Sequence, residues 1–287
     1  MPNPSPLRYP GGKSKTYKFI KLLIKSNNCT SYIEPFAGGA GVALNLLING
    51  DVKRIFINDF DRAIYAFWHS ALYQTEELIE LINKTPITME KWYELKEIQN
   101  RKNSAPLLEL GFSTLFLNRT NRSGILKGGV IGGKFQNGSY KMDCRFPKQK
   151  IINKIRKIAD LKDYIIIENM DALDFIDKII LKTRNSFTFF DPPYFKKGPS
   201  LYTNFYTEKD HYVLSKKIKL KLRNRKWIVT YDMCDEIKEM YSNLSYIEFY
   251  LTYTAQIKTQ GKEYMFFSKK TEFQSEQSIP LKLVSNS

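Results

Sequence analysis

Apolar residues along the chain fall into short continuous runs that are separated by segments with helical spacing. Runs of this length, rich in Ile, Val, Phe and Tyr, are typical of buried strands, and apolar positions three and four residues apart predict helices. The predicted strands are 32–34, 54–57, 164–168, 186–190, 226–231, 246–251 and 263–267, and the clearest early helices are 15–25 and 42–48.

The order of these elements predicts an open α/β sheet. Segments long enough for helical crossovers separate the first five strands, as parallel pairing requires. The last two strands are joined by a segment too short for such a helix, so the final strand is expected to be antiparallel.

The alternation of strands and helices is interrupted in the middle of the chain. From 62 to 159 the spacing is helical, apart from a polar, basic and glycine-bearing stretch at 118–145. We interpret this region as an insertion, which divides the chain into a first part of the core (1–60), an inserted domain (61–160) and a second part of the core (161–287). The alternative is one long surface excursion of a single domain.

The charge balance points to a polyanionic partner. The chain has 45 Lys and Arg against 29 Asp and Glu, a formal net charge of +16. Such an excess favours nucleic acid, because basic side chains that neutralise phosphates release counterions. An ordinary basic protein remains the alternative.

Cysteine and histidine usage argues against a disulfide scaffold and a metal centre. Cys29, Cys144 and Cys234 form no CxxC pair, and the chain has only two histidines. No apolar run approaches the length of a membrane span, and the first residues do not resemble a signal sequence. We therefore expect a cytoplasmic protein without metal.

A glycine turn follows the first predicted strand and opens a helix. Its sequence, EPFAGGAG at 34–41, lets the backbone approach a ligand closely at the carboxyl end of the strand. Asp59 ends the next strand, 21 residues after Gly38, where a carboxylate commonly binds ribose hydroxyls. The turn lacks the GxGxxG pattern of dinucleotide enzymes, which disfavours NAD; simple packing is the alternative interpretation.

The DPPY sequence at 191–194 carries the most specific chemistry. It follows the strand 186–190, so Asp191 is expected level with the glycine turn. An amino group on an aromatic ring is a poor nucleophile because its lone pair is delocalised. A carboxylate and a backbone carbonyl that accept its N–H bonds free that lone pair, while Tyr194 can stack on an extruded base. The alternative is a strand-end turn with a helix-capping Asp.

A third block, RYPGGK at 8–13, offers an aromatic face and a cation. Tyr9 could face an adenine ring or a sulfonium, and Lys13 could fix a carboxylate. As structure alone, it is a glycine turn before a helix.

Together these motifs resemble the Dam family of adenine-N6 DNA methyltransferases. The matching pieces, in chain order, are RYPGGK (8–13), YIEPFAGGAG (32–41), IND (57–59), NRTNRSGIL (118–126) and DPPY (191–194). The resemblance runs from 8 to about 268. It implies a seven-stranded, Rossmann-like α/β methyltransferase fold that uses S-adenosylmethionine, with an inserted, mostly helical target-recognition domain. The implied reaction is methylation of adenine N6 in double-stranded DNA after base flipping.

The resemblance also implies roles for individual residues. The cofactor would contact Tyr9, Lys13, Phe36, Ala37, Gly38, Gly39, Asp59, Asp171 and Asp191. The flipped adenine would contact Asp191, Pro192 and Tyr194, and DNA would contact Asn118, Arg119, Asn121, Arg122 and Lys127.

Four positions in three segments depart from the family pattern. Tyr9 stands where Trp is common, Arg122-Ser123 replaces the usual Phe-Asn, and Lys127 takes the place of an arginine that contacts a base in GATC-methylating relatives. The recognised sequence is therefore left open, as are the oligomeric state and a companion restriction endonuclease.

More than one interpretation stays open for several other residues and for the function. His211 follows the aromatics Tyr202 and Phe205 and has either a pocket role or a structural one, whereas His69 is expected to be structural. The basic side of the helix 150–161 faces either solvent or phosphate. The alternative functions are an RNA methyltransferase, a protein-amide methyltransferase (disfavoured by Asp at the first DPPY position) and a non-catalytic DNA-binding protein.

Overall fold

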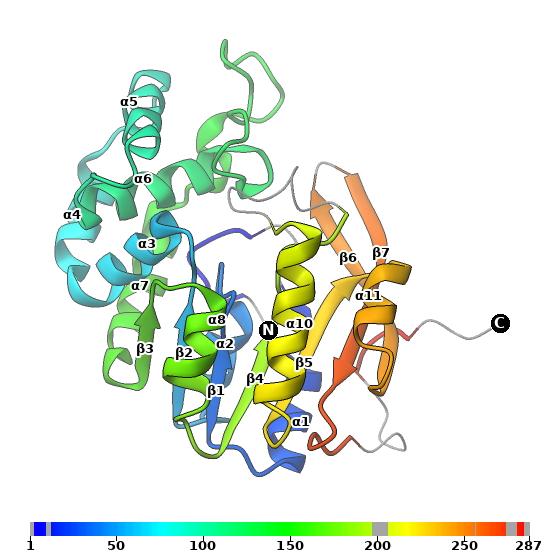
Figure 1. The fold of residues 1–287 in the computed structure, drawn as a ribbon. Helices are drawn as coiled ribbons and strands as arrows, with labels where there is room; N and C mark the ends of the chain where they lie inside the picture. The colour runs from blue at the N-terminus through cyan, green and yellow to red at the C-terminus, as the bar shows by residue number, and fades with distance from the viewer. Residues whose placement is uncertain (1–2, 10–12, 197–205, 256, 274–279, 284–287) are drawn as a thin grey trace.

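The computed structural model describes residues 3–9, 13–196, 206–255, 257–273 and 280–283. Its centre is a seven-stranded sheet in the order β3-β2-β1-β4-β5-β7-β6 (Figure 1). The strands are β1 (Ser31–Glu34), β2 (Arg54–Asn58), β3 (Ile165–Glu168), β4 (Ser186–Phe190), β5 (Lys226–Asp232), β6 (Tyr246–Ala255) and β7 (Ile257–Phe267).

Every predicted strand is present, and the predicted direction of the last strand is confirmed. The pairs among β1 to β5 are parallel, whereas β7 is antiparallel to both β5 and β6. This arrangement confirms the predicted α/β methyltransferase-type fold. The position of β7, between β5 and β6, had no signal in the sequence.

Helices cover both faces of the sheet, because successive strand residues point to opposite sides. One face packs against α1 (Tyr17–Ser26) and α2 (Gly41–Ile48), and the other against α8 (Ala172–Phe175), α10 (Glu208–Lys221) and α11 (Asp235–Met240). In β5, for example, Ile228 belongs to the first core while Trp227 and Val229 belong to the second. Figure 1 shows α10 in front of the sheet, with the carboxyl ends of β1 to β5 pointing upward.

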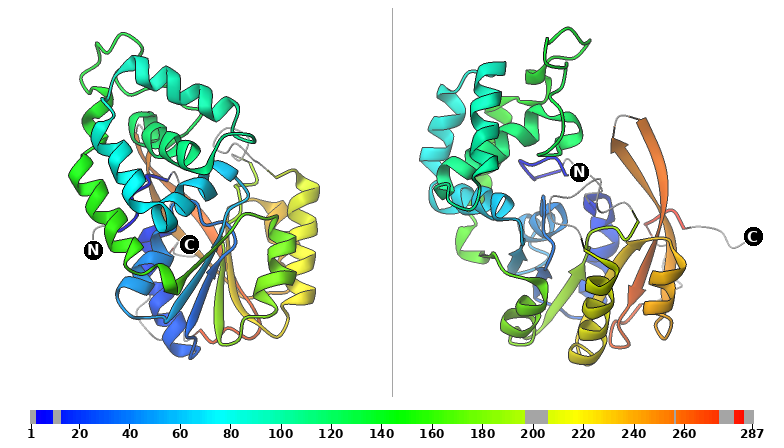
Figure 2. Two further views of the ribbon diagram at one scale, coloured as in Figure 1. Left: turned by 90° about the vertical axis from the view of Figure 1, so that its left-hand side faces the viewer. Right: turned by 45° about the horizontal axis from the view of Figure 1, so that its top comes forward.

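The chain between β2 and β3 forms a helical unit above those carboxyl ends (Figure 2). Its α-helices are α3 (Arg62–Tyr73), α4 (Thr75–Lys84), α5 (Met89–Asn100), α6 (Leu107–Thr120) and α7 (Lys148–Ala159). A loop with two short 3-10 helices, η2 (Arg122–Gly124) and η3 (Met142–Arg145), connects α6 to α7.

The apolar interior of this helical unit is continuous with that of the sheet. Trp92, Phe116 and Ile151 belong to the same buried cluster as Tyr32 and Phe187 of the central strands. Burial of apolar surface stabilises a fold by about 25 cal/mol per Å², so the two parts stabilise each other. The division at about 60 and 160 remains a description of chain order and a proposal about function.

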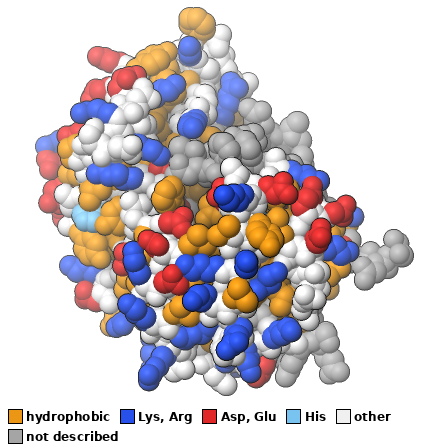
Figure 3. All heavy atoms as spheres, in the orientation of Figure 1, with side chains coloured by type: hydrophobic (Ala, Val, Ile, Leu, Met, Phe, Trp, Pro, Cys, Tyr) orange, Lys and Arg blue, Asp and Glu red, His pale blue; other side chains and the backbone are white. Residues whose placement is uncertain are grey.

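Basic side chains are not confined to the helical insertion. Figure 3 shows Lys and Arg spread over the lower part of one face, over α8 and α10. Among the described residues, no helix is both long and apolar enough to cross a membrane.

Candidate active site

Asn58 joins the loops that follow β1, β2 and β3. Its side-chain Nδ2 donates to the carbonyl oxygens of Pro35 and Met170, at 3.0 Å each. Its Oδ1 accepts from the Met170 backbone N–H at 3.0 Å. The amide therefore fixes three neighbouring strand ends in one register, at the edge where ligands bind to open α/β sheets.

The glycine turn after β1 is tightly packed against Tyr9. Gly38 has φ of +47°, which favours glycine, and a Cβ built there would lie 2.6 Å from the Tyr9 ring. The Gly38 N–H donates to Asp59 Oδ2 at 2.9 Å, and its carbonyl accepts from Trp68 Nε1 at 3.0 Å. Gly39 also lies against Tyr9, so the predicted residues of the turn and of the RYPGGK block come together.

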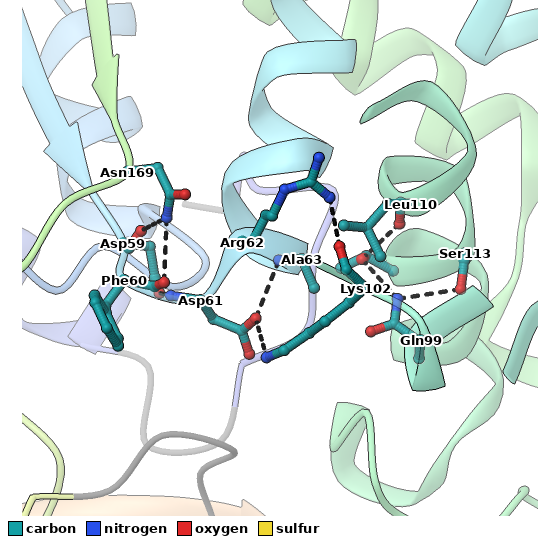
Figure 4. Close-up of polar contacts among 11 residues, drawn as sticks. Asp59, Phe60, Asp61, Arg62, Ala63, Gln99, Lys102, Leu110, Ser113 and Asn169 are labelled. Atoms are coloured by element: carbon teal, nitrogen blue, oxygen red, sulfur yellow. Dashed lines mark hydrogen bonds and ion pairs between the residues drawn. The ribbon is translucent and has the colours of Figure 1, made fainter. Parts of the chain in front are cut away.

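Asp59 lies at the end of β2, and each of its carboxylate oxygens accepts a hydrogen bond from one backbone N–H. Besides Gly38, the Asp61 N–H donates to Asp59 Oδ1 at 2.9 Å. Burial and the nearby Asp61 carboxylate raise the pKa of Asp59 to about 7. The next residue, Phe60, leaves 57% of its surface exposed at the same strand end (Figure 4). An exposed aromatic ring beside a carboxylate can cover an adenine base, and sequence analysis had not singled it out.

Asp61 and Arg62 connect this strand end to the insertion. Asp61 caps α3 by accepting from the Ala63 N–H at 3.0 Å, and its Oδ1 contacts Lys102 Nζ at 2.8 Å. Arg62 Nη1 donates to the carbonyl oxygens of Lys102 and Ala105 (Figure 4). The loop between α5 and α6 is thereby fixed to the end of β2.

Glu34, the first residue of the glycine motif, is buried beneath the turn. Its Oε1 accepts from the Tyr32 hydroxyl at 3.0 Å and from the Ala43 N–H at 3.2 Å. Burial raises the pKa of Glu34 to about 8, so its carboxyl is mostly protonated at neutral pH. Glu34 thus ties the start of α2 to β1 and brings little charge into the site.

Asp191 is held through one carboxylate oxygen. Thr230 Oγ1 donates to Asp191 Oδ1 at 2.7 Å, and Lys13 Nζ lies 2.8 Å from the same oxygen. Among the described residues, no donor contacts Oδ2. The Asp191 side chain remains 27% exposed, whereas Lys13 is only 4% exposed. The carboxylate is therefore fixed on its inner side and has an available acceptor on its outer side.

A second residue of β5 fixes the backbone after DPPY. Asp232 accepts from the backbone N–H groups of Phe195 at 2.9 Å and Lys196 at 3.2 Å. Thr230 and Asp232 are two residues apart, so both side chains leave the same face of β5. Neither residue was predicted, because Thr230 lies within β5, where threonine is common, and Asp232 ends the strand without a motif to mark it.

Tyr194 is buried and is fixed at its hydroxyl. It donates to Glu263 Oε1 at 2.8 Å, and Lys13 Nζ lies 3.5 Å from the same hydroxyl. Lys13 also lies 3.4 Å from Glu263 Oε2. Pro192 is buried beside them. The structure thus brings together Lys13, Asp191 and Tyr194 as predicted, and adds Glu263.

An aromatic cluster borders the other side of the glycine turn. The rings of Phe36 and Tyr206 lie 5.8 Å apart. Burial raises the pKa of Tyr206, and the nearby Asp171 carboxylate raises it further. Asp171 caps α8 by accepting from the Leu173 N–H at 2.7 Å. The predicted residues Phe36 and Asp171 therefore lie at one end of the site.

His211 lies in the same aromatic cluster, away from solvent. Its Nδ1 is 2.9 Å from the Tyr231 hydroxyl, and its ring contacts Phe195 and Tyr206. Burial lowers the pKa of His211 to about 4, so the ring is neutral at pH 7. A pocket role stays a prediction. His69 lies on α3 between Tyr65 and Tyr73, consistent with the structural role expected for it.

The predicted DNA-contacting asparagines are turned inward. Asn118 Oδ1 accepts from the Arg8 N–H at 2.7 Å, and its Nδ2 donates to the carbonyl oxygens of Arg8 and Gly124. Asn121 accepts from Trp92 Nε1 and donates to the carbonyl oxygens of Ile125 and Leu126. Both side chains are buried. The prediction that Asn118 and Asn121 contact DNA is not supported by this geometry, because their amides order the loop.

The basic residues of the same loop differ in exposure. Arg119 donates to the carbonyl oxygens of Pro6 and Arg145, and burial, reinforced by Arg8, lowers its pKa to about 10. Arg122 and Lys127 are exposed. Only these last two have the accessibility that the predicted DNA contact requires.

Some predicted features fall outside the described residues. They are Pro10, Gly11 and Gly12 of the RYPGGK block and the aromatics Tyr202 and Phe205. Within the described ranges, no group of three or more His, Cys, Asp or Glu side chains could bind a metal ion.

The fold and the site together define a class: an α/β enzyme with a glycine turn, a carboxylate at the end of β2 and a DPPY loop at one sheet edge. The model of the D12 class N6 adenine-specific DNA methyltransferases matches residues 9–255. The chain belongs to this family, which confirms the predicted adenine-N6 DNA methyltransferase and its reaction, the methylation of adenine in DNA.

Two curated relatives are similar over most of the chain. Type II methyltransferase M.MjaIII of Methanocaldococcus jannaschii is 26% identical over 204 residues, which cover 66% of this chain and 68% of the relative. Type II methyltransferase M.CviBI of Paramecium bursaria Chlorella virus NC1A is 25% identical over 248 residues, or 85% of this chain and 88% of the relative.

Proposed function

We propose that the protein is a site-specific methyltransferase that uses S-adenosylmethionine and acts on an adenine rotated out of double-stranded DNA. The observation that carries this proposal is the asymmetric Asp191 carboxylate. Its Oδ1 is fixed by Thr230 and Lys13, and its Oδ2 is left for a substrate donor at the sheet edge that also carries the glycine turn.

The residues at this edge fit S-adenosylmethionine. Gly38 and Gly39 let the Tyr9 side chain pack directly on the turn, because a Cβ at either position would press against it, and Tyr9 thereby provides an aromatic face there. Asp59 keeps lone pairs for ribose hydroxyls, Phe60 offers a ring for the adenine, and Phe36, Ala37 and Asp171 complete the pocket. When bound, this cofactor supplies a methyl group on a sulfonium, which is an activated leaving group.

The chain's own groups prepare the target nitrogen. Asp191 Oδ2 and the Pro192 carbonyl would each accept a hydrogen bond from the adenine amino group. These two hydrogen bonds would draw the nitrogen lone pair out of the ring system. Tyr194 would stack on the extruded base, whose removal from the helix costs a few kcal/mol. Catalysis then depends on positioning and on acceptors aimed at a nitrogen that becomes positive.

The exposed part of the loop between α6 and α7 is the proposed DNA contact. Gln136 folds inside this loop, donating to the carbonyl oxygens of Ile131 and Gly133 and accepting from the Met142 N–H. The neighbouring Phe135 points outward with 90% of its surface exposed, beside the exposed Lys134. The same loop also exposes Arg122, Lys127 and a second aromatic side chain, Tyr140. We assign target recognition to the insertion, residues 61–160, on this basis.

Transfer of labelled methyl groups from S-adenosylmethionine to duplex DNA and to RNA tests the proposal. Label on adenine N6 of DNA alone is the expected result, and label on RNA alone would contradict it. Sequencing of methylated DNA from expressing cells would then identify the recognition site. Adjacent genes would reveal a companion restriction endonuclease, which the Type II names of the two relatives make worth seeking.

Arg122→Ala or Lys127→Ala should relax the preference for one base of the recognition site. Arg and Lys side chains that contact guanine discriminate against a wrong base by about 1–3 kcal/mol. A residue that contacts only phosphate should instead weaken binding equally on every sequence and reduce the salt slope by about one unit.

Mapping of the methylated sites of each variant distinguishes the two outcomes. Lys162→Ala, an exposed lysine at the opposite end of β3, is the matched control. If both loop variants keep the parental sequence preference, this loop does not contact bases.

A further inference from the structure

Glu263 is a buried carboxylate near the middle of β7, where a mostly polar first half of the strand (257–262) meets an apolar second half (264–267). It lies on β7 directly opposite Asp232 of β5, and its residue is 0% exposed. The neighbours Met265 and Phe267, which share its face, belong to the hydrophobic core. An ionised group in such a place is costly unless it is paired, so its partners should explain its presence.

Those partners are the residues of the proposed site. Glu263 Oε1 accepts from the Tyr194 hydroxyl at 2.8 Å, and Glu263 Oε2 lies 3.4 Å from Lys13 Nζ. Lys13 in turn lies 2.8 Å from Asp191 Oδ1. The Lys13 ammonium therefore lies between two carboxylates. Glu263 is fully buried, whereas Asp191 is partly exposed to solvent.

We propose that Glu263 is a positioning residue for methyl transfer, acting through Lys13 on Asp191 and directly on Tyr194. This role rests on the proposed function of Asp191 and Tyr194. Glu263 offsets the charge of Lys13, so the ammonium can fix Asp191 Oδ1 without neutralising the carboxylate as a whole. Its contact with the Tyr194 hydroxyl fixes the plane of the ring against which the target base would stack.

The proposed effect is on the rate rather than on binding. The adenine nitrogen is neutral in the bound substrate and gains positive charge as its bond to the methyl carbon forms and the bond from sulfur breaks. Two carboxylates around one ammonium leave a net negative cluster beside that nitrogen, which stabilises the transition state more than the bound substrate. Loss of the Glu263 charge would leave Lys13 and Asp191 as a neutral pair.

The test compares Glu263→Gln with wild type in single-turnover methyl transfer at saturating cofactor and DNA. Glutamine keeps the size and one acceptor but removes the charge. We expect the rate to fall at least about tenfold, equivalent to about 1.4 kcal/mol, while the Kd values for S-adenosylmethionine and DNA change less than threefold. Glu248→Gln, on the neighbouring strand β6 of the same hairpin, is the matched control and should retain the wild-type rate.

A double-mutant cycle with Lys13→Met shows whether Glu263 acts through the ammonium. Under the proposal, adding Glu263→Gln to Lys13→Met should reduce the rate less than it does in wild type, because the charge to be offset is gone. Equal effects in both backgrounds would overturn the proposal, as would a rate within threefold of wild type. If Glu263→Gln alone does not fold, the double variant can still be compared with Lys13→Met. A double variant slower than Lys13→Met by the full tenfold would again contradict the proposed role.

These outcomes separate this inference from the proposed function. If Asp191→Ala retains activity, the proposed site is wrong. If only the Glu263 results fail, the site stands and Glu263 has a structural role.

Discussion

Replacement of Asp191 by alanine is expected to reduce methyl transfer by about a hundred- to a thousandfold, the loss typical of removing one group that acts in the transition state. Within the part of the chain that the structure describes, donors contact this carboxylate only at Oδ1, and we propose Oδ2 as the acceptor for the target amine. Because the side chain stands at a strand end and is partly exposed, the fold should persist. Single-turnover rates and thermal unfolding measure the two effects.

Two further variants sharpen this prediction. Asp191→Asn keeps the shape and one acceptor oxygen but not the charge, and should also lose most of the activity. Asp163→Ala removes an exposed carboxylate before β3 and should leave the rate unchanged. A rate within tenfold of wild type for Asp191→Ala would show that the DPPY carboxylate does not activate the amine.

Asp59→Ala should weaken binding of S-adenosylmethionine by at least about tenfold and affect DNA binding far less. A carboxylate that accepts from two ribose hydroxyls makes charge-assisted bonds, each worth about 1.5–3 kcal/mol. In wild type, binding of hydroxyl donors favours the ionised form. Since the pKa of free Asp59 is raised to about 7, affinity should rise as pH increases toward 7 and level off above it.

Calorimetry over this pH range tests both parts. The pH dependence should be smaller in Asp59→Ala, because the titrating group is gone. Asp61→Ala keeps the Asp59 carboxylate and should retain the cofactor affinity at pH 8, but its pH dependence should shift to lower pH, because the Asp61 charge that raises the pKa of Asp59 is removed. A loss of cofactor affinity below threefold in Asp59→Ala would leave Asp59 with only its structural contacts to Gly38 and Asp61.

Strands were predictable from the sequence because their buried runs are short, apolar and separated by turns. The inserted helices between Arg62 and Ala159 were predictable from a different signal, because their apolar residues recur at helical spacing. The location of β7 between β5 and β6 was not, because local spacing carries no information about which edge a strand joins.

The candidate site was predictable only where a motif marks it. The glycine turn, Asp59 and DPPY stand at strand ends, and parallel strands bring those ends together. Thr230 was missed because threonine is common inside strands. Asp232 directly follows the predicted strand 226–231 and Glu263 begins the predicted strand 263–267; a carboxylate at the end of a buried strand was the available signal, since it must find a partner. Asn118 and Asn121 are buried and order the loop, which could not be foreseen because such a polar side chain looks the same in sequence as one that faces a ligand; their contact with DNA stays a prediction.

The position of the insertion has a consequence for how such proteins diversify. The adjacent central strands β1 and β4 are separated in sequence by everything from Pro35 to Asn185, yet pair in register. The entropy of closing a loop grows only slowly with length, by about 0.6 kcal/mol for each doubling. The connection from β2 to β3 can therefore lengthen, shorten or exchange its outer loop at little thermodynamic cost, provided that α3 and α7 still pack on one another. Under the proposed assignment of target recognition to the insertion, new specificity can be acquired there by insertion and deletion, while the sheet edge with the glycine turn and DPPY stays unchanged.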